Sequence, residues 1–128
     1  MAENTIVILD TNIIIELYKG NSNIRHICEK IGEHNLYISE ISVAEFYFGA
    51  LNKKEIPFIK KHLDKFPWIP INEEISGIFT KFMIEYSLSH KPFIGDMLIA
   101  ATAIYYDVHV YTLNIKDFRF IKGIKLYS

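Results

Sequence analysis

Apolar residues fall along the chain in short continuous runs, separated by longer segments in which they recur every three or four positions. The first run, Ile6–Leu9, is β-branched and continuously apolar, which is typical of a buried parallel strand. Further strand candidates occur at Leu36–Ile38, Trp68–Ile71, Val108–Thr112 and Ile124–Tyr127. Pro70 limits how much of a ladder the second of these can form. The runs therefore predict several short strands.

The segments between these runs favour helices. Helices are predicted over Ile13–Lys19, Ile24–Ile31, Ser42–Leu51, Glu73–Ser87 and Met97–Tyr106, with a charged amphipathic segment at Lys53–Phe66. Gly20 is suited to end the first helix, and Ser22 or Asn23 to cap the second. Strands that alternate with helices predict βαβ units, and so an α/β fold with a central parallel sheet and helices on both faces.

Composition narrows the class of protein. The 128 residues suit a single domain spanning 1–128, and a hydrophobic share of 50% excludes a disordered chain. Fourteen basic residues against 15 acidic ones argue against coating of nucleic acid by bulk charge. The lone Cys28 indicates a reducing compartment, and the run Ile6–Leu9 is too short for a signal or membrane segment. We expect a cytoplasmic protein that does not enter a membrane.

Carboxylates recur where the predicted strands end. Asp10 follows the first strand, and Glu45 lies in the first turn of the helix after the second. Asp96 opens the Ala-rich helix, and Asp117 follows the strand Val108–Thr112. Ligands of open α/β sheets bind beyond the carboxyl ends of the strands, so these side chains can converge. Such a cluster is costly without a cation, and Mg²⁺ or Mn²⁺ prefers oxygen ligands.

Each carboxylate also has a purely structural explanation. Asp10 and Asp96 could be helix N-caps. Glu45 could complete a capping box with Ser42, and Asp117 could stabilise a turn through its own backbone. Taken one at a time these signals are weak, so the argument for a site rests on their common location.

Other catalytic and binding patterns are absent from the sequence. The five histidines show neither an i,i+4 pair nor a cysteine partner at zinc spacing. No G-x-S-x-G elbow, P-loop or G-x-G-x-x-G motif occurs. A group of lysines suits a solvated helix face and could also contact a phosphate backbone: Lys53, Lys54, Lys60, Lys61 and Lys65.

Four segments resemble, in order, the signature blocks of the PIN domain, and in particular those of VapC-like toxin ribonucleases. The segments are Ile8–Asn12, Ile38–Phe46 with Gly49–Ala50 after it, Gly95–Ala103 and Tyr111–Phe118. The resemblance spans nearly the whole chain. It implies a three-layer α/β/α sandwich with a central parallel sheet, and a Mg²⁺- or Mn²⁺-dependent endoribonuclease that acts as the toxin of a toxin–antitoxin pair.

Site residues follow from the resemblance position by position. The acidic positions that match metal ligands and catalytic groups are Asp10, Glu45, Asp96 and Asp117. Supporting polar positions are Asn12, Thr112 and Asn114, with Asn12 expected to orient Asp10. Either Asp117 or Asn114 could complete the site. The resemblance also implies an RNA substrate, a small antitoxin partner and a homodimer.

Two other functions remain open at this point. A phosphoacceptor signalling domain is also a small α/β fold with an acidic Mg²⁺ pocket, but Asp10 has no acidic neighbour and no lone Asp follows the strand ending at Ile38. The second alternative is a PIN-fold binding module without activity, which the intact carboxylates do not favour.

Overall fold

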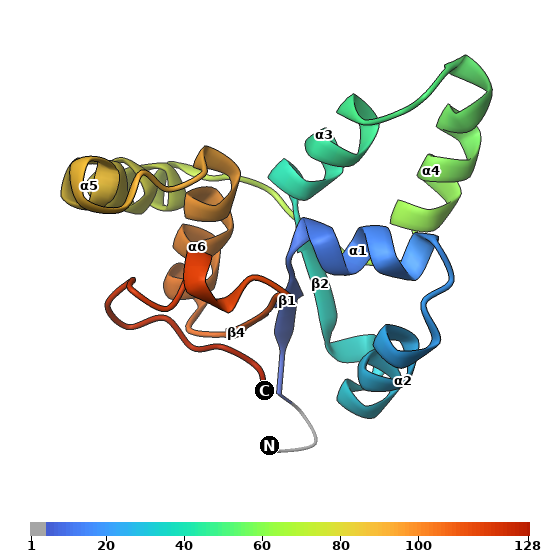
Figure 1. The fold of residues 1–128 in the computed structure, drawn as a ribbon, viewed down its shortest axis with the longest axis horizontal. Helices are drawn as coiled ribbons and strands as arrows, with labels where there is room; N and C mark the ends of the chain where they lie inside the picture. Colours follow the sequence, from blue (N-terminus) through green and yellow to red (C-terminus); the bar gives the residue numbers. More distant parts are fainter. Residues whose placement is uncertain (1–4) are drawn as a thin grey trace.

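The computed structural model describes residues 5–128, in which four strands form one parallel sheet (Figure 1). The strands are β1 (Val7–Leu9), β2 (Leu36–Ser39), β3 (Trp68–Ile69) and β4 (His109–Tyr111), in the order β3-β2-β1-β4. Val7 pairs with Leu36 on one side and with His109 on the other, so β1 is an interior strand. The predicted parallel sheet is confirmed. Because β1 lies between β2 and β4, its carboxyl end lies between the carboxyl ends of those two strands.

Helices cover both faces of this sheet. They are α1 (Thr11–Tyr18), α2 (Ser22–Ile31), α3 (Glu40–Phe48), α4 (Ile56–Leu63), α5 (Glu73–His90) and α6 (Ile94–Tyr106). Three single turns of 3₁₀ helix accompany them: η1 (Glu33–Asn35), η2 (Lys53–Glu55) and η3 (Ile115–Asp117). Figure 1 shows α1 to α4 on one side of the sheet and α5 and α6 on the other. The predicted three-layer α/β/α sandwich is confirmed.

Two apolar cores result from the alternation of side chains along β1. Val7 and Leu9 face the cluster formed with α1 to α4, whereas Ile8 faces the cluster formed with α5 and α6. All three side chains are fully buried. The short continuous apolar run thus serves both layers at once. Within residues 5–128 we find no helix that is both long and apolar enough to cross a bilayer.

Several helices begin earlier than the sequence predicts. Helix α3 begins at Glu40 because Ser39, the last residue of β2, caps it by accepting a hydrogen bond from the Ile41 N–H at 3.3 Å. Ser42 is therefore not a cap, and the predicted capping box with Glu45 does not form. Helix α2 is capped by Asn21, not by Ser22 or Asn23, because the Asn21 side chain accepts from the Ile24 N–H at 3.1 Å.

The elements in the second half of the chain also differ from the sequence prediction. Helix α6 begins at Ile94, so Asp96 lies inside its first turn and is not the N-cap. Helix α5 runs on to His90, three residues beyond the predicted end. The candidate strand at Ile124–Tyr127 forms only a single parallel bridge, between Leu126 and Val110.

Candidate active site

The structure brings the four predicted carboxylates to the carboxyl edge of the sheet. Asp10 directly follows β1, and Glu45 lies in α3, which follows β2. Asp96 lies in the first turn of α6, and Asp117 ends η3, beyond β4. Each of the other three carboxylates raises the pKa of Asp96, and those of Glu45 and Asp117 also raise that of Asp10. The four groups are therefore close enough to repel one another.

Asp10 is the most firmly held of the four. Its side chain is buried, with 4% of its surface exposed. Oδ1 accepts a hydrogen bond from the Thr11 backbone N–H at 2.8 Å, and Oδ2 accepts from the Thr112 hydroxyl at 2.7 Å. Burial raises the pKa of Asp10 above its ordinary value, and these two hydrogen bonds oppose that rise. Asp10 is thus both the cap of α1 and a member of the cluster.

The other two predicted supporting residues, Asn12 and Asn114, form hydrogen bonds with residues around Asp10. The Asn12 side-chain oxygen accepts from the Leu113 N–H over a long 3.5 Å, so it ties α1 to the loop after β4. The Asn114 backbone N–H donates to the Thr112 hydroxyl at 2.9 Å. Thr112 and the backbone of Thr11 contact Asp10 directly, whereas the Asn12 side chain contacts the backbone of Leu113.

Glu45 is held by a chain of two hydroxyl groups. Its Oε1 accepts from the Thr11 hydroxyl at 2.7 Å, and the Thr11 oxygen lies 2.8 Å from the Ser42 hydroxyl oxygen. A hydroxyl has a single hydrogen, which Thr11 gives to Glu45, so Ser42 donates to Thr11. Ser42 is fully buried, which fixes this chain against the core. The sequence paired Ser42 with Glu45 only as a possible capping box, and it gave no indication of Thr11, although Thr11 adjoins Asp10.

Asp96 has the most strongly perturbed carboxyl group of the four. Its pKa is raised from 3.8 to about 7, chiefly by burial and then by the charges of Asp10, Asp117 and Glu45. Among residues 5–128 the ion pairs join Lys19 to Glu16, Lys60 to Asp64 and Lys125 to Asp107. None of these pairs includes a carboxylate of the cluster, so the repulsion within it is not offset by an ion pair in this part of the chain.

The donor chemistry of the cluster suits a hard divalent cation. All four side chains offer carboxylate oxygens, which Mg²⁺ and Mn²⁺ prefer, and a cation among them would offset the charge repulsion that raises the pKa of Asp96. In their present positions, no three or more His, Cys, Asp or Glu side chains of residues 5–128 form a group that could hold a metal ion.

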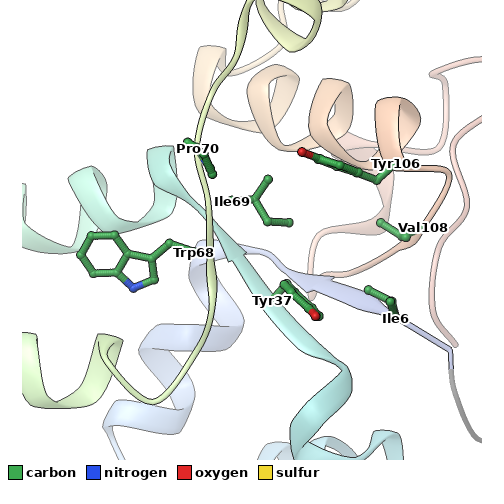
Figure 2. Close-up of a pocket in the computed structure, with 7 residues that line it drawn as sticks. All are labelled: Ile6, Tyr37, Trp68, Ile69, Pro70, Tyr106 and Val108. Atoms are coloured by element: carbon green, nitrogen blue, oxygen red, sulfur yellow. The ribbon is translucent and has the colours of Figure 1, made fainter.

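A separate apolar pocket lies away from this edge. It has a volume of about 340 Å³ and is lined by Ile6, Tyr37, Trp68, Ile69, Pro70, Tyr106 and Val108 (Figure 2). Ile6 and Val108 precede β1 and β4, so the pocket lies toward the amino ends of these strands. No acidic or basic side chain lines it. This pocket therefore offers none of the charged groups that the carboxylate cluster provides.

Fold and site together define an α/β/α domain with a carboxylate cluster at the carboxyl edge of its parallel sheet. Residues 7–122 match the PIN domain, and the chain belongs to the PIN domain family. It is 35% identical to Ribonuclease VapC1 of Rickettsia felis over 134 aligned positions, which cover 95% of each chain.

Solved structures of toxin–antitoxin complexes share this fold. A toxin-antitoxin complex from Klebsiella pneumoniae matches with 29% identity and a TM-score of 0.77, over 92% of this chain and 94% of that one. VapBC2 from Rickettsia felis, bound to a DNA fragment from its promoter, matches with 25% identity and a TM-score of 0.80, over 96% and 98%. The resemblance seen in the sequence is confirmed at the level of the family.

Proposed function

We propose that this chain is an endoribonuclease that depends on Mg²⁺ or Mn²⁺ and acts as the toxin of a toxin–antitoxin pair. The observation that carries the proposal is the common position of Asp10, Glu45, Asp96 and Asp117 at the carboxyl edge of the sheet. The names of the relatives, a VapC ribonuclease and two toxin–antitoxin complexes, support RNA as the substrate and a small antitoxin as partner. Membership of the PIN family disfavours a phosphoacceptor domain.

In this proposal the carboxylates hold the ion and Thr112 and Thr11 keep two of them in place. Asp10, Glu45, Asp96 and Asp117 would hold the ion after their side chains rotate toward one another, since among residues 5–128 no three such side chains are already placed to do so. A divalent cation supplies neutralisation of the negative charge that develops on a phosphodiester during cleavage. Because the pKa of Asp96 is about 7, a bound ion would favour its ionised form near neutral pH.

Glu45 has a second task besides helping to hold the ion, because it is the exposed member of the cluster. One carboxylate oxygen, Oε1, is engaged by the Thr11 hydroxyl at 2.7 Å. The other, Oε2, accepts the proton of the attacking water in our proposal, which makes Glu45 the general base. Lys91 lies exposed at the end of α5, shortly before α6 begins, and is suited to contact a phosphate of the RNA.

The biological setting is proposed from the relatives and from exposed apolar side chains. Such side chains at the surface of a small domain indicate contact with partners, and Phe48, Ile84 and Leu88 are all at least 80% exposed. We propose a homodimer in the cytoplasm that is neutralised by an antitoxin protein.

The test is cleavage of a looped RNA by the purified chain with Mg²⁺, with Mn²⁺, and in EDTA. We expect cleavage only with metal, and loss of cleavage in Asp10→Asn, Glu45→Gln and Asp96→Asn with the fold retained by circular dichroism. Their effects should not add, because the groups act as one unit. Glu29→Gln, which alters an exposed carboxylate in α2, is the matched control and should cleave normally. Full activity in EDTA would overturn the proposal.

A further inference from the structure

Gly95 occupies a position where the backbone does not call for glycine. It lies in the first turn of α6, directly before Asp96, and it is not among the glycines with positive φ. Glycine disfavours a helix relative to alanine because it loses more conformational freedom on folding. Its presence here therefore needs a reason outside the helix.

The reason lies in α3, on the side chain of Glu45. A Cβ atom added to Gly95 would be 2.6 Å from Oε2 of Glu45, 3.1 Å from its Cδ and 3.3 Å from its Oε1. The first of these distances is well inside van der Waals contact. The Glu45 carboxylate thus lies directly against the backbone of α6, in the space that any side chain at Gly95 would fill.

The Glu45 carboxylate has to shift to make room for such a Cβ atom, and this shift pulls it away from the position in which its present partner holds it. Its Oε1 is held by the Thr11 hydroxyl at 2.7 Å, and Thr11 is held in turn by Ser42 at 2.8 Å. The carboxylate is the end of a flexible side chain, so an added methyl group would displace it without disrupting the core. The expected result is a folded protein in which Glu45 is misplaced.

We propose that Gly95 is a positioning residue: its missing side chain lets the Glu45 carboxylate lie between Thr11 and the first turn of α6, beside Asp96. The expected effect of Gly95 on the binding of a divalent ion by the cluster rests on the proposed function. Residues that orient metal-binding groups typically change metal affinity by roughly 10–100-fold when they are substituted.

The chain provides a matched control in Gly77. This glycine lies in α5, is exposed, and has nothing within 4 Å of the place where a Cβ atom would be. Gly77→Ala makes the same chemical change in a helix without affecting a carboxylate. Any general effect of replacing a helical glycine by alanine is therefore measured separately.

The first experiment measures Mn²⁺ affinity by electron paramagnetic resonance of the free ion. We compare the unmodified chain, Gly95→Ala, Gly77→Ala, Glu45→Ala and the Glu45→Ala/Gly95→Ala double variant. Gly95→Ala should weaken Mn²⁺ binding by roughly 10-fold or more, and Gly77→Ala by less than about twofold. In the Glu45→Ala background the Gly95 change should have no further effect, because the carboxylate that it displaces is gone.

The second experiment needs no metal and tests the positioning itself. Crystal structures of the unmodified chain and Gly95→Ala, both grown in EDTA, give the distance from Glu45 Oε1 to Thr11 Oγ1. We expect the hydrogen bond at 2.7 Å to persist in the first and to be broken in the second. If Gly95→Ala keeps that bond, Gly95 does not position Glu45 and the inference is wrong. If the unmodified chain binds no Mn²⁺ and cleaves no RNA, the proposed function fails, while the crystal structures still decide the role of Gly95.

Discussion

The Thr112 hydroxyl donates a 2.7 Å hydrogen bond to the Asp10 carboxylate across 102 positions of sequence. Both side chains are buried, and they come from the ends of β1 and β4, which pair directly. The bond therefore joins neighbouring strands at the point where the proposed chemistry takes place. It also opposes the rise in the pKa of Asp10 that burial causes.

Removing this donor should destabilise the protein. Thr112→Val keeps the shape of the side chain but leaves a buried carboxylate oxygen of Asp10 without its partner, at a cost of about 1–3 kcal/mol in the free energy of unfolding. The pKa of Asp10 should rise further. Thr112→Ser retains the hydroxyl and loses one methyl group, or about 1 kcal/mol. Urea unfolding compares the two variants, and a larger loss in the serine variant would contradict the role given to the hydroxyl.

The raised pKa of Asp96 predicts how stability depends on pH in EDTA. The carboxyl titrates near 3.8 in the unfolded chain and near 7 in the folded one, so between these values the folded state holds more protons. The free energy of unfolding contributed by Asp96 is therefore lost as pH rises from about 4 to about 7. Since the group is partly exposed, we expect a change of about 1–3 kcal/mol.

The measurement is urea unfolding of the unmodified chain and Asp96→Asn across this pH range. The stability of Asp96→Asn relative to the unmodified chain should increase with pH and then level off above about pH 7. Titrating groups outside the carboxylate cluster, such as the buried His62 with its lowered pKa, are common to both proteins and cancel in the difference. A difference that stays constant with pH would show that Asp96 is not perturbed as described.

Exposed apolar side chains on α5 predict the surface of the homodimer. Ile84 and Leu88 lie four residues apart, on one face of the helix, and are 80% and 89% exposed. Replacing both by Glu should convert a dimer at micromolar concentration into a monomer in light scattering. Phe48→Glu alters an equally exposed side chain on the other side of the sheet and should leave the dimer intact. A monomeric unmodified chain at every concentration would contradict the homodimer.

We predict that Lys91 strengthens RNA binding and that its contribution decreases as the salt concentration rises. In an Asp10→Asn background, which is expected not to cleave, Lys91→Gln should weaken binding of single-stranded RNA at low salt. The slope of log affinity against log salt should decrease by about 0.7, the value for one phosphate contact on a single strand. Lys30→Gln, which removes an exposed charge from α2, serves as the control. Equal effects of the two substitutions would mean that Lys91 contributes only general charge.

The sequence predicted the features that depend on short, continuous stretches of residues. Continuous apolar runs predicted the parallel strands, and the parallel arrangement then placed the strand-end carboxylates together. Helix starts were less predictable because several residues compete as caps: Ser39 and Ser42 are both suitable, and the end of β2 decides in favour of Ser39.

The contacts that shape the site could not be predicted from sequence because they depend on how helices pack. Thr11 reaches Glu45 across 34 positions, and Gly95 meets the same side chain across a different helix interface. Neither contact leaves a periodic signal. Asp10 and Asp96 could be predicted as site residues because carboxylates at strand ends are suited to bind a cation. The roles of the two hydroxyl groups and of Gly95 can be recognised only when the residues that pack against them are known.

The central claim is that the four carboxylates act as one cation-binding unit, and thermal unfolding with and without Mg²⁺ tests it most directly. In EDTA at about pH 8, where Asp96 with its pKa of about 7 is mostly ionised, Asp96→Asn should melt at a higher temperature than the unmodified chain because one repelling charge is gone. With roughly ten millimolar Mg²⁺ and a site of roughly millimolar Kd, the unmodified chain should gain about RT ln 11, or about 1.4 kcal/mol, and melt roughly 3–6 °C higher. The variant should gain much less, so the order of the two melting temperatures reverses. If Asp96→Asn melts lower in EDTA and Mg²⁺ moves neither curve, the four carboxylates do not act as a cation-binding unit.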